Sequence, residues 1–554
     1  MSRRPAAAVA TALLLALLAW LVLYPLVLVL AEGVRGPGGW TLEHVREFVG
    51  RPTEMRSLWN SLWISLATVA LAALLGVPLA FLLGRYDLPG GQVLGGLVAL
   101  PAVLPPLVGV MAFLFLYGET GFVPLLLMWL LRLEEPPWRL EGAGAILLVH
   151  AYSMYVYFYL LVRAALVSLD ASQLEAAASL GAGRWRTFRW VVLPHLAPAL
   201  AGATLLTFMT SLGSFSAPYV FGGGFRVMPT QIVATRLNGE TQLAMIETAS
   251  LALIALLALL LFRGSSRATT GGRKGAGPAR IVIGGRLARA SAGLVGWVLA
   301  ALLLLPHLTL VLVSFVPVGT WTTEPLPPAY TVHNYVALVE DPVRVRPLMN
   351  SIWLATVATV AAVGIALAGA LLNARRPTPA RRAIEGLLAL PWAVPGTVFA
   401  IALATAFSVH APATGRFVLV GTLWILPLAY LVRNLPITSR AINAGVRALD
   451  PSLDEAAASL GAGRLRTLRR VTLPLLRPAL LAGASLAFVT AFGDFVTSIM
   501  LYTYDTRPIS LEILSSLRQA DVGVAAAYGV VLMLVSAVVF ALGSGGQGRG
   551  GNAG

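Results

Sequence analysis

The sequence predicts an all-α integral membrane protein of about 12 transmembrane helices, arranged as two parallel six-helix repeats. Three observations predict this fold. Hydrophobic residues make up 58% of the 554 residues and charged residues only 12%, far outside the composition of soluble domains. Apolar windows of about 20 residues, long enough to cross a bilayer, recur along the chain. A string of ten residues occurs twice without change, as Glu175 to Arg184 and as Glu455 to Arg464.

The composition also excludes several classes of function. The chain contains no cysteine, which excludes disulfides, thiolate metal sites and cysteine nucleophiles. The formal charge of +16 comes from positive residues scattered between apolar runs, and no basic stripe is present. We therefore expect the lipid bilayer, and no nucleic acid, among the partners.

The predicted spans lie where about 20 apolar residues follow one another, since that length crosses about 30 Å of hydrocarbon. The first half has spans near residues 6–31, 59–84, 93–117, 143–167, 193–214 and 242–262. The second half has spans near residues 290–316, 350–372, 384–408, 417–432, 473–495 and 525–542. The apolar segment 122–131 is too short to cross and is predicted to be interfacial or re-entrant.

Arginine-rich segments set the predicted orientation. With a cytoplasmic N-terminus these segments all fall on the cytoplasmic side, as the positive-inside rule requires: 184–189, 263–289, 375–382 and 464–470. Both termini are then cytoplasmic. The Gly-, Ser- and Arg-rich segment 264–289 is predicted to be a flexible cytoplasmic linker between the halves 1–263 and 290–543, and 544–554 a disordered tail.

The internal repeat extends well beyond the ten identical residues. Its matched positions include Leu193-Pro194 with Leu473-Pro474, Phe208 with Phe488, Asn60-Ser61 with Asn350-Ser351, and Trp63 with Trp353. Each half has an even number of spans, so both repeats should cross the membrane in the same orientation.

The identical string lies in two predicted cytoplasmic loops, 170–194 and 450–474. Each loop has the pattern of a short helix, a glycine turn and a second short helix, with Asp170 and Asp450 as N-caps. Small residues on one face would let the backbone of another protein approach closely. A basic amphipathic helix at the lipid headgroups explains the same residues equally well. The residues alone leave protein docking and lipid contact both open.

Both loops fit the pattern Glu-Ala-Ala, three residues, Gly, nine residues, an aliphatic residue, one residue and then Leu-Pro. This pattern resembles the EAA loop of permease subunits of binding-protein-dependent ABC importers, with Val191 and Val471 at the aliphatic position. The fused two-copy form resembles the ferric-iron permeases over nearly the whole chain. The resemblance implies that each loop couples to an ATP-hydrolysing subunit through these residues: Glu175, Ala176, Ala177, Gly181, Glu455, Ala456, Ala457 and Gly461.

The same resemblance implies a multi-pass permease in the bacterial inner membrane, working with two copies of an ABC ATPase subunit and a periplasmic or extracellular substrate-binding protein. Ferric iron is the expected cargo, with thiamine, phosphonate and polyamines as alternatives. The chain has no Gly-x-x-x-x-Gly-Lys-Ser/Thr phosphate loop, because its sole lysine, Lys274, is not followed by Ser or Thr. We therefore expect no enzyme activity and no cofactor in this chain, with ATP and Mg²⁺ held by the partner subunits.

A secondary transporter with six plus six parallel spans is the alternative from another class. Such transporters couple ions through ionisable groups deep in their spans. The candidates of this kind are few, and for each a satisfied interior group facing a cavity is favoured over a coupling site: Glu247, His307 and Asp494.

Candidate path residues occur where the chemistry of a span is unusual. The prolines of the third and ninth spans are predicted to kink them, either to free carbonyls that line a path or, equally, to serve helix packing: Pro101, Pro105, Pro106, Pro391 and Pro395. An aromatic belt is favoured over cation binding for the tyrosine cluster Tyr152, Tyr155, Tyr157 and Tyr159.

Asp494 stands where the first half has Ser214. A carboxylate near hydrocarbon is expected either to face an aqueous cavity, where it can contact a hard cation, or to cap a helix or pair with a donor. We assign Asp494, Ser214 and Glu247 to the substrate path and no residue to a resident metal site.

Overall fold

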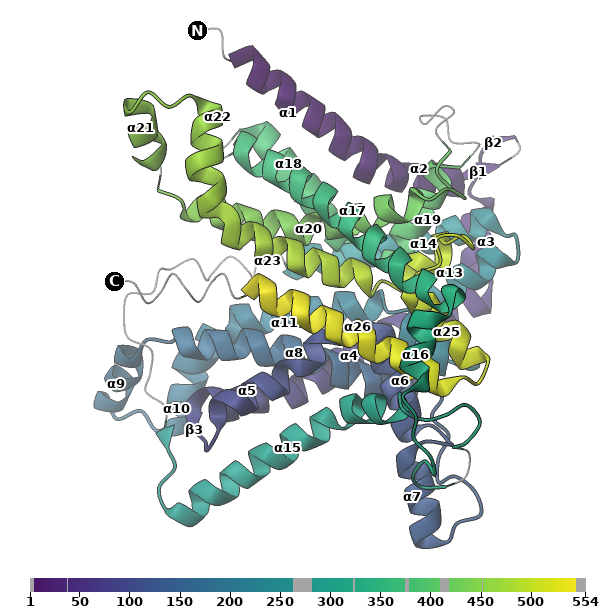
Figure 1. The fold of residues 1–554 in the computed structure, drawn as a ribbon. Coiled ribbons are helices and arrows are strands. Elements are labelled where there is room, and N and C mark those ends of the chain that lie inside the picture. The colour runs from purple at the N-terminus through teal and green to yellow at the C-terminus, as the bar shows by residue number, and fades with distance from the viewer. Residues whose placement is uncertain are drawn as a thin grey trace. The chain divides into compact units, whose positions relative to one another are not determined.

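The computed structural model describes residues 4–36, 38–262, 281–321, 324–373, 378–408, 418–450 and 452–544. These residues are mostly helical (Figure 1). The strands among them form two short pairs: β1 (Arg35–Gly36) is antiparallel to β2 (Gly39–Trp40), and β3 (Tyr86–Asp87) is parallel to β4 (Ile281–Val282). The predicted all-α membrane fold is confirmed.

The two halves contain similar successions of helices. The helices before residue 263 are α1 (Arg4–Leu18), α2 (Tyr24–Gly33), α3 (Glu43–Gly50), α4 (Pro52–Arg85), α5 (Gly91–Ala99), α6 (Pro106–Tyr117), α7 (Phe122–Leu131), α8 (Gly142–Ser168), α9 (Ala171–Ser179), α10 (Arg184–Thr187), α11 (Leu193–Leu212), α12 (Ser216–Phe221), α13 (Met228–Leu237) and α14 (Thr241–Phe262). Those that follow are α15 (Arg286–Val313), α16 (His333–Glu340), α17 (Pro342–Asn373), α18 (Pro379–Ala389), α19 (Gly396–Ala406), α20 (Ile425–Ala448), α21 (Ser452–Ser459), α22 (Arg464–Thr467), α23 (Leu473–Phe492), α24 (Val496–Leu501), α25 (Ile509–Arg518) and α26 (Val522–Ser544).

Ten helices in the described part of the chain are long and apolar enough to cross a membrane. A bent pair, Pro379–Trp392 with Gly396–Ala406, adds an eleventh span if it is counted as one. This pair is the predicted ninth span, and its two parts meet at 109° because prolines at 391 and 395 remove helical N–H donors. The predicted third span is divided in the same way into α5 and α6. The proline kinks are therefore confirmed.

The tenth predicted span, 417–432, is placed wrongly. Helix α20 begins at Ile425 and continues to Ala448, through Arg433, Arg440 and Arg447. These arginines lower the mean hydropathy of the helix, so an apolar window ends at Arg433 although the helix does not.

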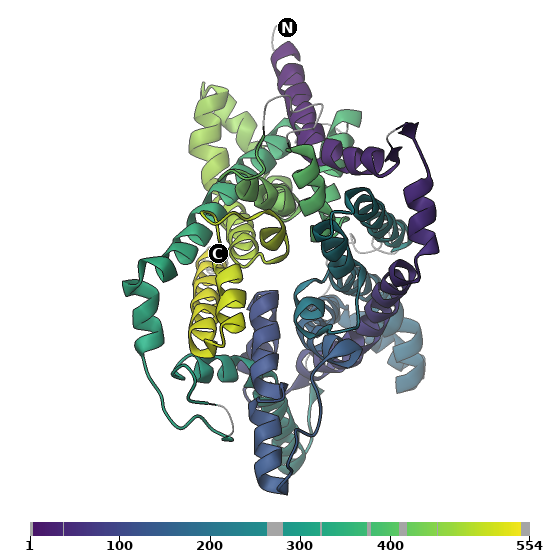
Figure 2. The same cartoon turned by 90° about the vertical axis from the view of Figure 1, so that its right-hand side faces the viewer.

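The short apolar segment predicted to be interfacial or re-entrant forms α7. Alone it has ten residues, about half the length needed to cross hydrocarbon. Together with α6 it belongs to an apolar stretch, Pro106–Leu131, that is long enough to cross. Helix α7 projects from the rest of its own unit (Figures 1 and 2).

The chain packs as two compact units, and each unit draws on both sequence halves. The α4 unit contains residues 48–234 and 250–331, and the α17 unit contains residues 1–47, 235–249 and 332–554. The first long helix of each half packs with helices of the other half, since α15 contacts α6 and α2 contacts α19. The packing units therefore do not follow the repeat boundaries predicted at 263 and 290.

Each unit has a core of three long helices that pack against one another. In the α4 unit these are α4, α8 and α11, and in the α17 unit they are α17, α20 and α23. Helices α4 and α8 approach closely at Gly76, where an added Cβ would lie 2.3 Å from the carbonyl oxygen of Tyr155. Small residues allow such close contacts between membrane helices.

Candidate functional site

The first helix of each repeated loop begins at an aspartate cap. Asp170 accepts a hydrogen bond from the backbone N–H of Ser172 at 3.0 Å, and Asp450 accepts one from Ser452 at 2.9 Å. The bond from Ser452 favours the ionised carboxylate and holds the pKa of Asp450 below its ordinary value. Each cap satisfies a donor that the first helical turn leaves unpaired, so the predicted helix starts are confirmed.

A glycine in the left-handed conformation ends each of these helices. Gly181 has a φ of +72°, which residues with a Cβ rarely adopt. Its N–H bonds the carbonyl of Ala178 at 2.9 Å, and the N–H of Ala182 bonds that of Ala177 at 3.0 Å. This double closure is a Schellman motif. The second loop repeats it at a φ of +73°, with Gly461 to Ala458 at 3.0 Å and Ala462 to Ala457 at 2.9 Å.

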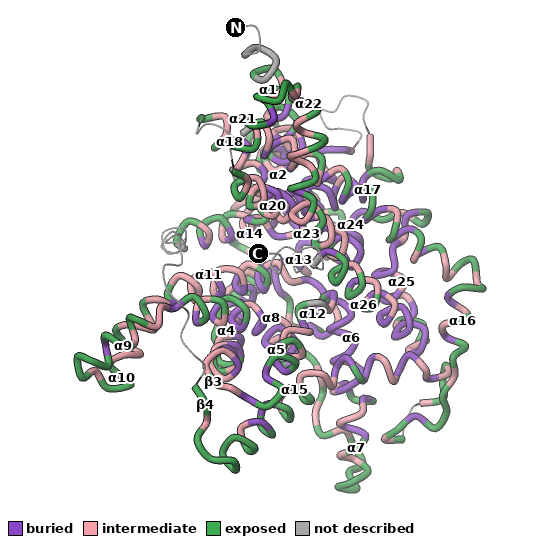
Figure 3. The backbone as a smooth tube through the Cα atoms, turned by 60° about the vertical axis from the view of Figure 1, so that its left-hand side comes forward, coloured by how far each residue is buried: buried purple, intermediate pink, exposed green. Residues whose placement is uncertain are grey.

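The loops present their predicted coupling residues at the surface (Figure 3). Two alanines are buried, Ala177 and Ala457, and the others are exposed: Glu175, Ala176, Gly181, Glu455, Ala456 and Gly461. Leu180 beside the glycine is 86% exposed, and its counterpart Leu460 is 88% exposed. The two loops therefore expose equivalent apolar and acidic side chains.

The second helix of each loop continues directly into a long span. A π-helical turn, Phe188–Val192, joins α10 to α11, and Leu468–Thr472 joins α22 to α23. The continuous helix from Arg184 to Leu212 has 29 residues. Each repeated loop is therefore joined to α11 or α23 by continuous helix.

Asp494 follows α23 and is buried. Its Oδ2 accepts a hydrogen bond from Nη1 of Arg433 at 2.6 Å. Its Oδ1 accepts the backbone N–H groups of Thr497 at 2.8 Å and Ser498 at 3.2 Å, which caps the short helix α24. The carboxylate thus has the pairing and capping role that the sequence left as an alternative to direct contact with cargo.

Ser214 occupies the matching position in the first half and belongs to a neutral network. Its Oγ lies 2.8 Å from Nε2 of His150. The other ring nitrogen of His150 lies 3.1 Å from Oγ of Ser211 and 3.3 Å from Oγ1 of Thr68. Sequence reasoning missed both His150 and Arg433, although a lone polar residue inside an apolar helix is a recognisable feature.

Glu247 lies in α14 and is fully buried. Its Oε1 accepts a hydrogen bond from Oγ1 of Thr235 at 2.8 Å. No group of three or more His, Cys, Asp or Glu side chains that could hold a metal ion occurs within the described ranges.

The aromatic-belt prediction is wrong for three of the four tyrosines. Tyr152, Tyr155 and Tyr159 are buried. Their hydroxyls donate to backbone carbonyls: Tyr155 to Val98 at 2.7 Å, Tyr159 to Gly95 at 3.0 Å and Tyr152 to Leu303 at 2.7 Å. Tyr155 therefore satisfies a carbonyl of the broken third span next to Pro101, which has no N–H group to pair with it, whereas Tyr159 bonds a carbonyl inside α5.

Comparison with known proteins gives a match to the family model for the binding-protein-dependent transport system inner membrane component, over residues 76–268 and again over 362–544. The probable ABC transporter permease protein y4fN of Sinorhizobium fredii is 30% identical over 492 residues, covering 88% of this chain and 86% of that protein. The ferric transport system permease protein FbpB of Actinobacillus pleuropneumoniae is 28% identical over 535 residues, covering 94% and 75%. The molybdenum transport system permease protein ModB of Escherichia coli is 35% identical over 217 residues, covering 37% and 91%.

Proposed function

Because this chain belongs to the family of binding-protein-dependent transport system inner membrane components, we propose that it imports ferric iron with energy supplied by two ATPase subunits docked on its repeated loops. The chain is an ABC importer permease and a multi-pass membrane protein. Membership in this family leaves the secondary-transporter alternative without support.

The duplicated docking loop is the observation that carries the proposal. Both loops have an aspartate cap, a left-handed glycine and an exposed leucine in equivalent places. Two loops with the same geometry fit two copies of the same partner, whereas lipid contact would not require equal turns. Glu175 and Glu455 lie exposed next to these turns, where they can contact the ATPase directly.

Ferric iron is supported by the name of the Actinobacillus relative, which is similar to this chain over 94% of its length. The molybdenum permease is similar over only 37% of the chain. Thiamine, phosphonate and polyamines are the other candidate cargoes. The substrate-binding protein delivers the cargo at the face opposite the docking loops, and both termini of the permease are cytoplasmic.

Uptake of radioactive iron tests this cargo. A bacterial strain lacking its own ferric permease receives this chain with its ATPase and binding protein, and uptake is measured at limiting iron. We expect ATP-dependent uptake that excess ferric iron abolishes and that excess molybdate, thiamine or putrescine leaves unchanged. Absence of ATP-dependent uptake of radioactive iron would contradict ferric iron as the cargo.

A further inference from the structure

A cluster of hydrogen bonds joins the start of α4 to the segment that leads into α13. Nδ2 of Asn60 donates to the carbonyl oxygen of Arg226 at 2.8 Å. Oγ of Ser61 accepts the backbone N–H of Met228, the first residue of α13, at 2.7 Å. The indole N–H of Trp63 donates to Oδ1 of Asn60 at 3.3 Å, which orients the amide. We call this arrangement the first clasp.

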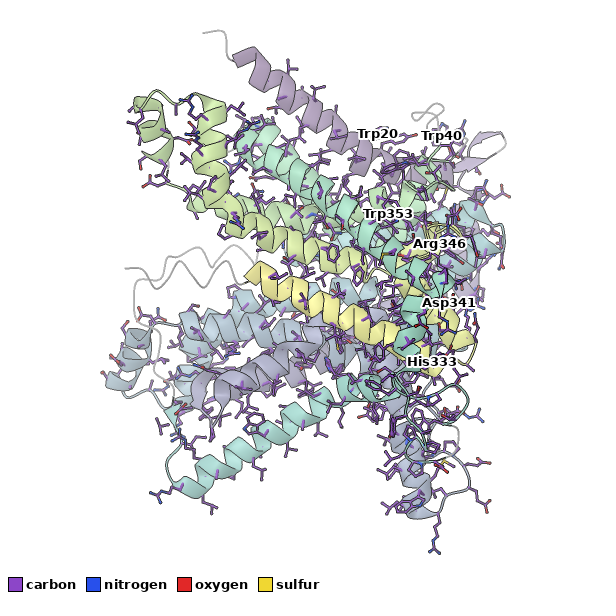
Figure 4. The ribbon with its side chains drawn as sticks, viewed as in Figure 1. Trp20, Trp40, His333, Asp341, Arg346 and Trp353 are labelled. Carbon is purple, nitrogen blue, oxygen red and sulfur yellow. The ribbon has the colours of Figure 1, made fainter. Side chains whose placement is uncertain are left out.

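The second half contains the same arrangement at the start of α17. Nδ2 of Asn350 donates to the carbonyl oxygens of Asp505 at 2.9 Å and Arg507 at 3.0 Å. Oγ of Ser351 accepts the N–H of Ile509, the first residue of α25, at 2.8 Å. Trp353, labelled in Figure 4, donates to Oδ1 of Asn350 at 3.4 Å. This is the second clasp, and it explains why Asn, Ser and Trp recur together in the repeat.

Both clasps are buried, which makes their bonds costly to break. Asn60, Ser61, Asn350 and Ser351 are each less than 9% exposed. Each serine oxygen accepts a hydrogen bond from the first N–H group of a short helix. In other helices an N-cap residue next to the helix satisfies such a group. An unpaired buried donor or acceptor is unfavourable, so each short helix is held firmly to its long helix.

The docking loops connect mechanically to these clasps. In the α4 unit the first docking loop joins α8 to α11, and both helices pack on α4. In the α17 unit the second docking loop joins α20 to α23, and both pack on α17. In each unit the clasp lies at the end opposite the docking loop (Figure 1). Each long helix therefore links its docking loop at one end to a short helix at the other.

We propose that the two clasps make α13 and α25 follow α4 and α17 when the docking loops are moved, and so couple ATP hydrolysis to the opposite mouth of the path. Asn60, Ser61, Asn350 and Ser351 are positioning residues, because they act through the helices they hold. The proposal rests on the proposed function only in requiring that a partner ATPase moves the docking loops.

Proteoliposomes containing the permease, its ATPase and its loaded binding protein test the proposal. In the double variant Asn60→Ala with Asn350→Ala, we expect the ATPase to copurify and hydrolyse ATP as in wild type, while substrate transported per ATP falls about tenfold. An unchanged ratio of transport to hydrolysis would overturn the clasp proposal. Loss of ATPase binding in the wild type would instead refute the docking assignment, so the two failures are distinguishable.

Matched controls separate coupling from folding. Ser57→Ala and Thr356→Ala remove hydroxyls from the same two helices that bond only within their own helix, at 2.9 Å to Thr53 and 2.7 Å to Ile352. These controls should keep the wild-type ratio of transport to hydrolysis. An equal fall in the controls would show that the effect is not specific to the clasps.

A cross-linked variant tests the proposal even if the alanine variant folds poorly. Because the chain has no cysteine, Ser61→Cys with Met228→Cys provides a unique pair of thiols for a short cross-linker. We expect the uncross-linked pair to transport with a low ratio of transport to hydrolysis and the cross-linked pair to recover the wild-type ratio. Inhibition by the cross-link would mean that α13 must separate from α4 during transport, which contradicts the proposal.

Discussion

Nη1 of Arg433 lies 2.6 Å from Oδ2 of Asp494, joining two residues that are 61 positions apart in the second half. The matching position of the first half holds Ser214, which pairs with His150 at 2.8 Å. The two halves thus have different polar groups at equivalent places. The carboxylate that the sequence offers to a cationic cargo is already neutralised by an arginine of the same unit.

Breaking this ion pair should chiefly lower the free energy of unfolding, because Asp494 pairs with Arg433 and not with cargo. Asp494→Asn leaves Arg433 without its counterion, which costs about 3 kcal/mol, at the low end for a buried pair because the arginine side chain is 28% exposed. We expect a lower midpoint of thermal unfolding in detergent and a smaller yield of folded protein. The double variant Asp494→Asn with Arg433→Gln should be more stable than Asp494→Asn alone. A double variant less stable than either single variant would contradict the pairing.

Removing the hydroxyl of Ser214 should have a smaller effect. Ser214→Ala loses one neutral hydrogen bond to His150, about 1 kcal/mol, and leaves no charge unpaired. The same unfolding assay should place this variant between wild type and Asp494→Asn. A larger loss than that of Asp494→Asn would mean that the His150 network, and not the ion pair, is the stronger constraint.

The left-handed glycines of the docking loops should be intolerant of alanine. Gly181→Ala and Gly461→Ala each place a Cβ on a residue with φ near +72°, at a cost of about 1 to 2 kcal/mol, although no atom lies within 4 Å of the added group. We expect the double variant to insert in the membrane but to retain less ATPase on affinity purification.

Gly183→Ala is the matched control for these variants. Gly183 has a φ of −65° and equally open surroundings, so alanine fits there without strain. Full ATPase retention is expected. Equal retention by the Gly181→Ala and Gly461→Ala double variant would show that the backbone turn does not matter for docking.

Tyr155→Phe should weaken the broken third span. The carbonyl of Val98 loses its partner in a buried environment, which costs about 1 to 3 kcal/mol. Unfolding by sodium dodecyl sulfate in mixed micelles should detect this loss, and Tyr86→Phe, at an exposed tyrosine, is the control. Identical unfolding curves for the two variants would remove the proposed role of the tyrosine hydroxyl.

A topology reporter tests the predicted orientation. Gly272 belongs to the predicted linker and lies outside the described residues. A reporter active only in the periplasm and fused there should stay silent, because the surrounding arginines favour the cytoplasmic side. Strong reporter activity would reverse the orientation proposed for the second half.

Local rules in the sequence predicted the geometry of the two repeated loops well. The cap at Asp170 and the glycine turn at Gly181 depend on a few neighbouring residues, and both appear in the structure. The kinks at the prolines were predictable for the same reason. The recurrence of Asn60, Ser61 and Trp63 was visible in the sequence, but their partners lie more than 160 residues away along the chain.

Features that depend on packing between distant helices were not predictable. In the sequence Arg433 reads as the charged end of an apolar window. Its counterion, Asp494, lies 61 positions away and is brought close only by the fold. Tyr155 resembled a member of an aromatic belt, because its acceptor is a backbone carbonyl that a proline frees in another helix. The first long helix of each half packs in a unit formed mainly by the other half, and no local pattern in the sequence indicates this.

The stoichiometry of the assembled transporter tests the central claim most directly. Native mass spectrometry of the purified complex, with the nucleotide-bound ATPase added in excess, counts the ATPase subunits bound to each chain. The duplicated docking loops predict two subunits per chain. A complex that holds one ATPase subunit, or none, under these conditions would contradict the account.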